Sequence, residues 1–377
     1  MSPSSAPALP SRRRFLSRLA LGASAATVAS MLPRPLGAFG GLHGGRKLGV
    51  ALVGLGSYST GQLGPALRET MHCGLAAVVT GSPEKGRQWT KDYGLREGAV
   101  YGYDDMHRLA DDPEVDIVYV VTPPGLHAEH TIRAAKAGKH VICEKPMANT
   151  AAECDAMIAA CREAGVKLSI GYRLHFHPTH RELMRLSRER DFGRLTKLEG
   201  GFGFRTGNRG WRLNKALGGG GPLMDVGIYV IQAACMAAGT EPVALTAREL
   251  PKTRPELFSE VEETIEFDLE FPDGVRCSGR TSYNENYNRF RAESQGGGWI
   301  EIEPAYSYRG VRGRTHLGPL PASDVNQQAL QMDAFARNIL DGTESIVPGE
   351  MGQRDMRIID TIYESARRGG VRLEVPA

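Results

Sequence analysis

The chain has 377 residues, enough for two domains that each bury a core, with 41% hydrophobic and 24% charged residues. This composition excludes a largely disordered chain and a bundle embedded in a bilayer. The formal net charge of +3 does not indicate nucleic-acid binding, because the excess is confined to the N-terminus. The first 38 residues hold five arginines and no acidic residue, so the rest of the chain carries −2.

The N-terminal segment has the pattern of an export signal. The run Ser11-Arg12-Arg13-Arg14-Phe15-Leu16 precedes a mildly apolar stretch rich in Ala, Gly and Ser, which is typical of the twin-arginine route. That stretch is too short and too weakly apolar for a stable membrane span of about 20 residues. We expect residues 1–38 to be a cleaved signal peptide, residues 39–46 a short arm, and the mature protein to be periplasmic without membrane contact. The export machinery would be a transient partner.

Short β-branched runs alternate with helical periodicity from Lys47 onward, which predicts βαβ units and a parallel sheet. The expected strands are 48–53, 75–80, 116–121, 140–144 and 167–171. The expected helices are 106–110, 128–137 and 152–164. We therefore predict a doubly wound Rossmann domain over residues 47–171.

Strands follow one another with few helices between them after Tyr172, which predicts a second domain over residues 172–377. The expected strands are 195–204, 243–249, 264–271, 275–282 and 299–303. The expected helices are 181–190, 223–238, 327–340 and 351–367. The fold class is thus α/β plus α+β, with a large, mostly antiparallel open sheet in a C-terminal substrate and dimerisation domain. Segments 206–212 and 283–291 are expected to be irregular pocket walls.

A glycine-rich turn, Gly54-Leu55-Gly56-Ser57-Tyr58-Ser59, follows the first expected strand. Glycine suits a turn where backbone N–H groups approach a pyrophosphate, so the turn predicts a dinucleotide site. The second strand ends at Thr80, and Gly81-Ser82-Pro83-Glu84-Lys85 offers hydroxyls and a cation without a carboxylate at the strand tip. This favours NADP over NAD.

Two further motifs carry chemistry. Cys143-Glu144-Lys145-Pro146 closes a buried strand at the carboxyl edge of the sheet, where a cofactor crevice lies. Four glycines and Pro222 introduce a helix in which Asp225 and Tyr229 are four residues apart, and hence on one face. From spacing alone, helix capping and packing remain the alternative explanation for this pair.

Histidines and cysteines do not indicate a metal. His175, His177 and His180 form a cluster that we interpret as pocket lining or helix capping, and we predict no metal site. The cysteines show no ligand spacing and are expected to be core residues without disulfides: Cys73, Cys143, Cys154, Cys161, Cys235 and Cys277.

From Lys47 to the C-terminus the chain resembles the Gfo/Idh/MocA oxidoreductase family. The resemblance rests on VGLG, LHAEHTIRAAKAGKHVICEKPMA, IGYRLHFHP, WRLNKALGGGGPLMDVGIY and PGEMGQRDMRIIDTIYESAR. Within the family it is greatest to the periplasmic glucose-fructose and aldose-aldose oxidoreductases, which also carry twin-arginine signals. The arm is shorter than that of glucose-fructose oxidoreductase, where it supports a tetramer. We therefore expect a homodimer, with a tetramer as the alternative.

The resemblance implies that Lys145 and Tyr229 are catalytic, that Asp225 assists, and that Lys145-Pro146 is a cis peptide. Residues that would bind the sugar are Lys145, Tyr172, Arg173, Asp225 and Tyr229. Residues that would line NADP are Gly54, Gly56, Ser57, Tyr58, Thr80, Gly81, Ser82, Lys85, Tyr103, Thr122, Pro123, Leu126, His127, Glu144, Lys145, Arg173, Trp211 and Arg212.

The implied reaction follows from export, since free NADP is not expected outside the cytoplasm. A tightly bound, non-exchanging NADP can turn over only in a ping-pong cycle. Tyr229 would take the proton of the anomeric hydroxyl of a cyclic aldose, giving an aldonolactone, and a second aldose or ketose would then leave as an alditol. Lys145 would favour the phenolate by its charge and hold the sugar. The alternatives are an exported NAD-dependent glycosidase, a non-catalytic sugar sensor, and an ordinary dehydrogenase with exchangeable cofactor.

Overall fold

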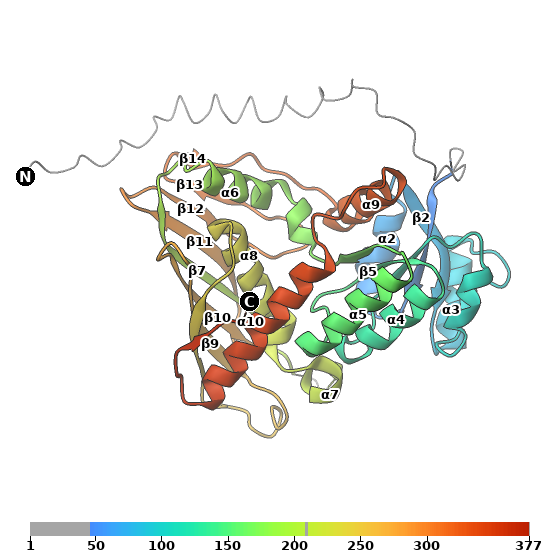
Figure 1. Cartoon of the computed structure of the whole chain (residues 1–377), viewed down its shortest axis with the longest axis horizontal. Helices are drawn as coiled ribbons and strands as arrows, with labels where there is room; N and C mark the ends of the chain where they lie inside the picture. Colours follow the sequence, from blue (N-terminus) through green and yellow to red (C-terminus); the bar gives the residue numbers. More distant parts are fainter. Residues whose placement is uncertain (1–45, 208–209, 377) are drawn as a thin grey trace, which may run out of the picture.

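The computed structural model describes residues 46–207 and 210–376. The expected signal peptide and all of the arm except Arg46 lie outside these residues. Figure 1 shows two sheets side by side, with helices packed around the first and between the two. The fold class predicted from the sequence is confirmed: a parallel Rossmann sheet is followed by a larger, mostly antiparallel mixed sheet.

The first sheet has six parallel strands whose order reverses between β1 and β4, which is the doubly wound arrangement. From edge to edge these strands are β3 (Val100–Tyr101), β2 (Cys73–Val79), β1 (Leu48–Val53), β4 (Ile117–Val120), β5 (His140–Cys143) and β6 (Leu168–Ile170). The five expected strands are confirmed within two residues at each end. Strand β3 was not predicted, because two residues carry no periodicity.

The helical segments around this sheet are η1 (Ser59–Leu63), α2 (Gly64–Leu67), α3 (Pro83–Tyr93), η2 (Met106–Asp111), η3 (Pro124–Leu126), α4 (His127–Lys136) and α5 (Ala151–Glu163). Local chemistry sets their ends. Thr150 and Glu153 form a reciprocal capping box at the start of α5, and Gly94 ends α3 with φ of +65°.

In the described part of the chain the second sheet has nine strands, and β7 and β10 form its one parallel pair. In order they are β14 (Gly318–Pro319), β13 (Gly313–Thr315), β12 (Trp299–Ile302), β11 (Tyr287–Ser294), β7 (Leu195–Gly203), β10 (Arg276–Ser282), β9 (Thr264–Glu270), β8 (Ala244–Glu249) and β15 (Leu373–Glu374). The expectation that 283–291 is irregular was wrong from Tyr287 onward. Outward charges at Arg289 and Arg291 alternate with buried Phe290 and Ala292 there, and they obscured the strand pattern.

The remaining helical segments are η4 (Arg173–Phe176), α6 (Pro178–Arg188), η5 (Trp211–Leu213), α7 (Lys215–Gly218), η6 (Leu223–Gly227), α8 (Ile228–Ala238), α9 (Gln327–Leu340) and α10 (Gly349–Arg367). Helices α6, α8 and α10 lie on the inner face of the second sheet (Figure 1). The stretch Lys215–Ala238 is long and apolar enough to cross a membrane, but 94% of its most apolar 18-residue window is buried inside the protein. It is therefore best explained as a core element.

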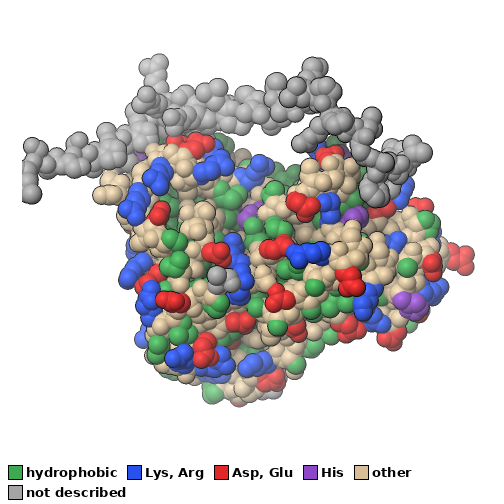
Figure 2. Space-filling model, viewed as in Figure 1, with side chains coloured by type: hydrophobic (Ala, Val, Ile, Leu, Met, Phe, Trp, Pro, Cys, Tyr) green, Lys and Arg blue, Asp and Glu red, His purple; other side chains and the backbone are tan. Residues whose placement is uncertain are grey.

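Charged side chains of both signs are mixed on the face of the protein that Figure 2 shows, where Lys and Arg are interspersed with Asp and Glu. On the outer face of the second sheet, Arg289 pairs with Glu199, and Arg291 lies 3.3 Å from Glu301. Such paired charges keep a broad sheet face polar. All six cysteines are buried and unpaired, as expected of core residues.

Candidate functional site

The turn after β1 has the backbone that a phosphate-binding loop requires. Gly54 has φ of +100°, and a Cβ there would lie 3.0 Å from the Val121 carbonyl oxygen, so only glycine fits. Gly56 is exposed, and a Cβ on it would meet no atom within 4 Å. The Ser59 hydroxyl donates to the Gly54 carbonyl at 2.6 Å and closes the turn. These residues fit a dinucleotide whose pyrophosphate lies at the helix N-terminus.

The loop after β2 lies against this turn. The Ser82 backbone N–H donates to Thr80 Oγ1 at 3.1 Å, and Ser82 in turn caps α3 by accepting from the Lys85 N–H at 3.3 Å. Lys85 Nζ donates to the Leu55 carbonyl at 3.2 Å, which brings its charge beside the glycine turn. The strand tip itself carries a hydroxyl, and Glu84 is exposed in the first turn of α3. The predicted ribose-side residues are thus brought together.

Tyr103 and Thr122 follow the carboxyl ends of β3 and β4, at the same edge of the sheet as the glycine turn. The Tyr103 ring stacks on His130 with centroids 5.2 Å apart, and a Cβ on Gly81 would lie 3.3 Å from that tyrosine ring. Thr122 Oγ1 lies 3.0 Å from His130 Nδ1. Pro123 precedes the η3 turn that follows, and Leu126 is the last residue of that turn. His130 was not predicted from the sequence.

Both ring nitrogens of His127 contact backbone carbonyls, and its place beside the cofactor stays a prediction. His127 is 1% exposed, with Nε2 2.7 Å from the Thr122 carbonyl and Nδ1 2.9 Å from the Pro146 carbonyl. Burial lowers the pKa of His127 to about 4, against the two carbonyls that favour its charged form. Its ring nitrogens are thus used to join the ends of β4 and β5. The Lys145-Pro146 peptide beside it is cis, as expected.

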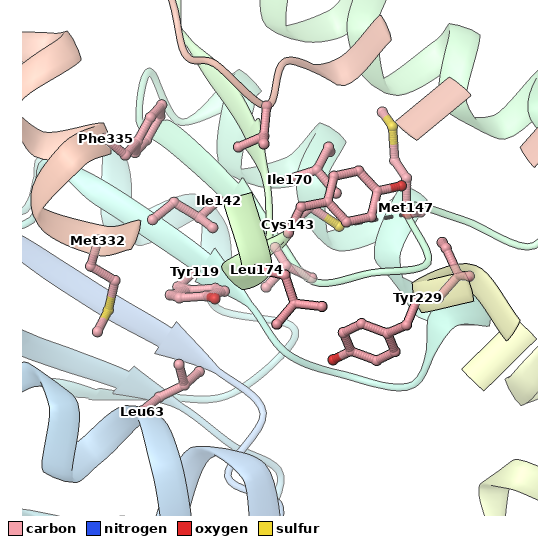
Figure 3. Packing of buried hydrophobic residues seen from close by; sticks show 14 of the residues in the cluster. Leu63, Tyr119, Ile142, Cys143, Met147, Ile170, Leu174, Tyr229, Met332 and Phe335 are labelled. Atoms are coloured by element: carbon pink, nitrogen blue, oxygen red, sulfur yellow. Dashed lines mark hydrogen bonds between the residues drawn. The ribbon is translucent and has the colours of Figure 1, made fainter. Parts of the chain in front are cut away.

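Lys145, Asp225 and Tyr229, here called the Lys145 cluster, meet between the two sheets. Lys145 Nζ donates to the Asp225 carbonyl at 2.6 Å, lies 3.5 Å from Asp225 Oδ1, and lies 4.6 Å from the centroid of the Tyr229 ring. In Figure 3, Tyr229 extends from its helix towards the Rossmann sheet, on the side of Tyr119 and Cys143. The two predicted motifs therefore form one site.

Asp225 lies in a widened helical turn, η6, in which the Ile228 N–H bonds the Leu223 carbonyl five residues back. Such π-turns inside helices are frequent at functional sites. Arg212 Nε donates to Asp225 Oδ2 at 2.7 Å and the Tyr283 hydroxyl donates to the same oxygen at 3.0 Å. Burial alone would raise the pKa of Asp225, but Lys145, Arg212 and Tyr283 lower it to about 2. Asp225 is therefore an anion that fixes the cations around it.

Glu144 and Arg173 border the Lys145 cluster. The Tyr119 hydroxyl donates to Glu144 Oε1 at 2.6 Å, and the Lys145 backbone N–H donates to Oε2 at 3.3 Å. Burial raises the pKa of Glu144 against these bonds and the nearby cations. Arg173 is 2% exposed and donates from Nε to the Tyr229 hydroxyl oxygen at 3.3 Å. Tyr58 faces the same region from the glycine turn, with its ring 5.7 Å from that of Tyr308.

Two predicted site residues, Tyr172 and Trp211, make no direct contact with the Lys145 cluster among the hydrogen bonds and ring contacts of the described residues. Tyr172 is 4% exposed; its ring lies 6.2 Å from His175, and burial and Asp355 raise its pKa well above the ordinary value. Its place in the sugar pocket therefore stays a prediction. Trp211 contacts the site through Arg212, whose guanidinium lies 4.4 Å from the indole centroid.

Of the histidine cluster, His177 caps α6 by accepting from the Thr179 N–H, as one of the two interpretations predicted. His175 Nε2 lies 2.7 Å from Gln232 Oε1, and His180 is fully buried. Within residues 46–207 and 210–376, no group of three His, Cys, Asp or Glu side chains could hold a metal ion.

Besides His130, the sequence did not predict Tyr283, Tyr308 and Gln327, the last of which accepts a hydrogen bond from Arg173. Tyr283 opens the segment 283–291 expected to form a pocket wall, so its neighbourhood, but not its bond to Asp225, could be predicted. Tyr308 follows no motif, and Gln327 was expected only as the first residue of a helix. The positions of Tyr308 and Gln327 depend on the path of the chain after β12, which carries no sequence signature.

Family models match both halves of the chain. Residues 48–172 match the model described as "Oxidoreductase family, NAD-binding Rossmann fold", and residues 180–302 match "GFO/IDH/MocA C-terminal domain". Together they cover well over half of the sequence.

Solved structures and curated relatives agree with these models. The aldose-aldose oxidoreductase of Caulobacter crescentus, complexed with glycerol, is 46% identical with a TM-score of 0.84, covering 87% of this chain and all of that one. The NADP(+) D-xylose 1-dehydrogenase of Haloarcula marismortui is 29% identical over 86% of this chain and 92% of its own length. The D-glucoside 3-dehydrogenase of Escherichia coli is 26% identical over 85% and 96%. The chain therefore belongs to the Gfo/Idh/MocA family of oxidoreductases and resembles its sugar oxidoreductases.

Proposed function

We propose that this protein is a periplasmic sugar oxidoreductase that keeps NADP tightly bound. It oxidises a cyclic aldose at C1 to an aldonolactone and reduces a second sugar, an aldose or a ketose, to an alditol in a ping-pong cycle. The observation that carries the proposal is the Lys145 cluster, assembled at the edge of a dinucleotide-binding sheet. The 46% identity to an aldose-aldose oxidoreductase supports the same reaction class.

The three residues of the Lys145 cluster have different roles in the proposed reaction. Tyr229 accepts the proton of the anomeric hydroxyl during oxidation and returns it to the carbonyl oxygen of the acceptor sugar. Lys145 orients the sugar hydroxyl, and Asp225 fixes Lys145 and Arg212 through its carbonyl and carboxylate. When bound, the nicotinamide supplies the hydride acceptor and donor.

The preference for NADP rests on the loop after β2. Thr80 presents a hydroxyl at the strand tip, where an NAD site normally places a carboxylate for the ribose. Lys85 lies beside the glycine turn through its bond to Leu55. A 2′-phosphate would gain hydroxyl and ammonium donors there, and hydrogen bonds from an ammonium group to a phosphate are strong.

Retention of the cofactor follows from export. If residues 1–38 direct the folded protein through the twin-arginine route, NADP must be loaded in the cytoplasm and kept. The cofactor can then be re-oxidised only by a second sugar in the same pocket. A homodimer formed through the outer face of the second sheet is part of the same proposal.

The test is the absorbance of reduced nicotinamide in extensively desalted protein, with no cofactor supplied. We expect it to rise when glucose is added and to fall when a second aldose or fructose follows. Activity that appears only with added free NADP would contradict retention and leave an ordinary dehydrogenase, as the similarity to D-xylose 1-dehydrogenase also allows. Hydrolysis of a chromogenic glycoside would indicate the glycosidase instead. Sugar binding without any redox change would indicate the sensor.

A further inference from the structure

Arg173 is a buried cation bonded to neutral acceptors. It lies in η4, directly after β6, and is 2% exposed. Its Nη1 donates to the Ser307 carbonyl at 3.2 Å and to Gln327 Oε1, and its Nη2 donates to the Tyr306 carbonyl. Its Nε donates to the Tyr229 hydroxyl oxygen at 3.3 Å. None of these acceptors is a carboxylate.

Among the described residues, Arg173 is the cation for which a hydrogen bond to the Tyr229 oxygen is seen. Lys145 bonds the Asp225 carbonyl and approaches the face of the Tyr229 ring, 4.6 Å from its centroid. The negative charge of Asp225 is paired with Lys145 and Arg212. Arg173, in contrast, forms no hydrogen bond with a carboxylate within the described residues.

The strength of the hydrogen bond from Arg173 to Tyr229 depends on whether the tyrosine is ionised. A charged donor in a low-dielectric site bonds an anionic oxygen far more strongly than a neutral one. Burial of a guanidinium is also costly until an anion forms beside it. Ionisation of Tyr229 would supply that anion. Gln327, which is fully buried and donates from Nε2 to the Ser307 and Tyr308 carbonyls at 3.0 Å each, holds Arg173 in place.

We propose that Arg173 is a positioning residue that stabilises the phenolate of Tyr229 and fixes the direction of its oxygen. The proposal rests on the function proposed above, in which Tyr229 takes the sugar proton. It adds that the electrostatic support for this step comes mainly from Arg173 at the oxygen, and that Lys145 is left to orient the sugar.

Other charged and titratable groups also face Tyr229. Lys145 and Glu144 approach from the end of β5, Asp225 from η6, Tyr58 from the glycine turn and Tyr308 from the loop before β13. Arg173 also lies over the Tyr308 ring, 4.6 Å from its centroid, and its charge acts on Glu144, Tyr58 and Tyr308. A change in the pH profile is therefore assigned to Tyr229 only when the ionisation of Tyr229 itself is followed.

The first measurement is the pH profile of sugar oxidation in R173Q and R173K, both made in the full-length protein. In R173Q we expect the acid limb of kcat to move up by roughly one to two pH units, so that the rate falls roughly ten- to hundredfold at neutral pH and recovers in alkali. R173K should restore part of the wild-type profile. The control R185Q removes a half-buried arginine whose partners are Glu182, Glu189 and Asp191, and should leave the limb in place.

The second measurement does not depend on turnover. The tyrosinate absorbance of wild type minus that of Y229F, recorded against pH, isolates the ionisation of Tyr229. We expect the corresponding difference in the R173Q background, R173Q minus R173Q/Y229F, to appear at higher pH than the wild-type difference. An unmoved signal in R173Q would overturn the proposal, whatever the activities. Full activity in Y229F with a shifted signal would instead contradict the proposed function and leave the Arg173–Tyr229 coupling intact.

Discussion

Replacing Asp225 by Asn should destabilise the protein in a pH-dependent way. The pKa of Asp225 falls from the ordinary 3.8 to about 2 in the folded protein, because Lys145, Arg212 and Tyr283 outweigh the effect of burial. Lowering a pKa by one corresponds to about 1.4 kcal/mol, so ionisation of this carboxyl stabilises the native state by about 2 kcal/mol. Asp225 is 9% exposed, so solvent screening takes little from this figure.

The sign of the pH dependence follows from the lowered pKa. Stabilisation is complete above about pH 4, where the unfolded carboxyl is ionised, and it is lost as pH falls towards about 2. We expect D225N to lower the free energy of unfolding by about 2 kcal/mol near neutral pH, with roughly half of that difference left near pH 3.

Urea denaturation of D225N and wild type at several pH values measures this difference. Asp273 in the exposed β9–β10 turn is the matched control, since D273N keeps the backbone carbonyl that accepts from Arg194 and should change stability by less than about 0.5 kcal/mol. A D225N protein as stable as wild type, or a deficit that does not shrink towards low pH, would refute the reasoning.

Three substitutions test the rest of the site. K145M should lower kcat for sugar oxidation by roughly a hundredfold or more while the cofactor content of the purified protein, read from its absorbance, stays unchanged; equal activity would remove Lys145 from the mechanism. T80D should reduce NADP content in favour of NAD, because a carboxylate at the strand tip repels the 2′-phosphate; an unchanged ratio on extraction would contradict the NADP assignment. G54A should abolish cofactor binding, since a Cβ would lie 3.0 Å from the Val121 carbonyl, whereas G94A, strained at φ of +65° in open space, should lower only the melting temperature.

Periodicity and motif position made most of the fold predictable. The strands around Val53 and Cys143 are continuous apolar runs, which fits a buried parallel sheet. Strand β11 was missed because its outward positions carry charges, such as Arg291, that normally mark loops. The short strands β3, β13, β14 and β15 exist only because longer neighbours offer them a hydrogen-bonding edge.

The site was predictable where residues follow strand ends or open a helix. Lys145 and Gly54 are of this kind, since the carboxyl ends of parallel strands meet at one edge. The roles of His127 and Tyr172 were harder to predict from the sequence, because they depend on burial and on hydrogen-bonding partners. The bond from Tyr283 to Asp225 joins segments 58 residues apart, and no local pattern indicates it.

Transfer of deuterium between two sugars tests the central claim most directly. Protein supplied with glucose deuterated at C1 and an unlabelled acceptor sugar should place one deuterium in each molecule of alditol, even when excess unlabelled NADPH is present, because the bound cofactor carries the label and does not exchange. Alditol without deuterium under these conditions would show that hydride passes through the free pool, and would contradict the retained-cofactor cycle.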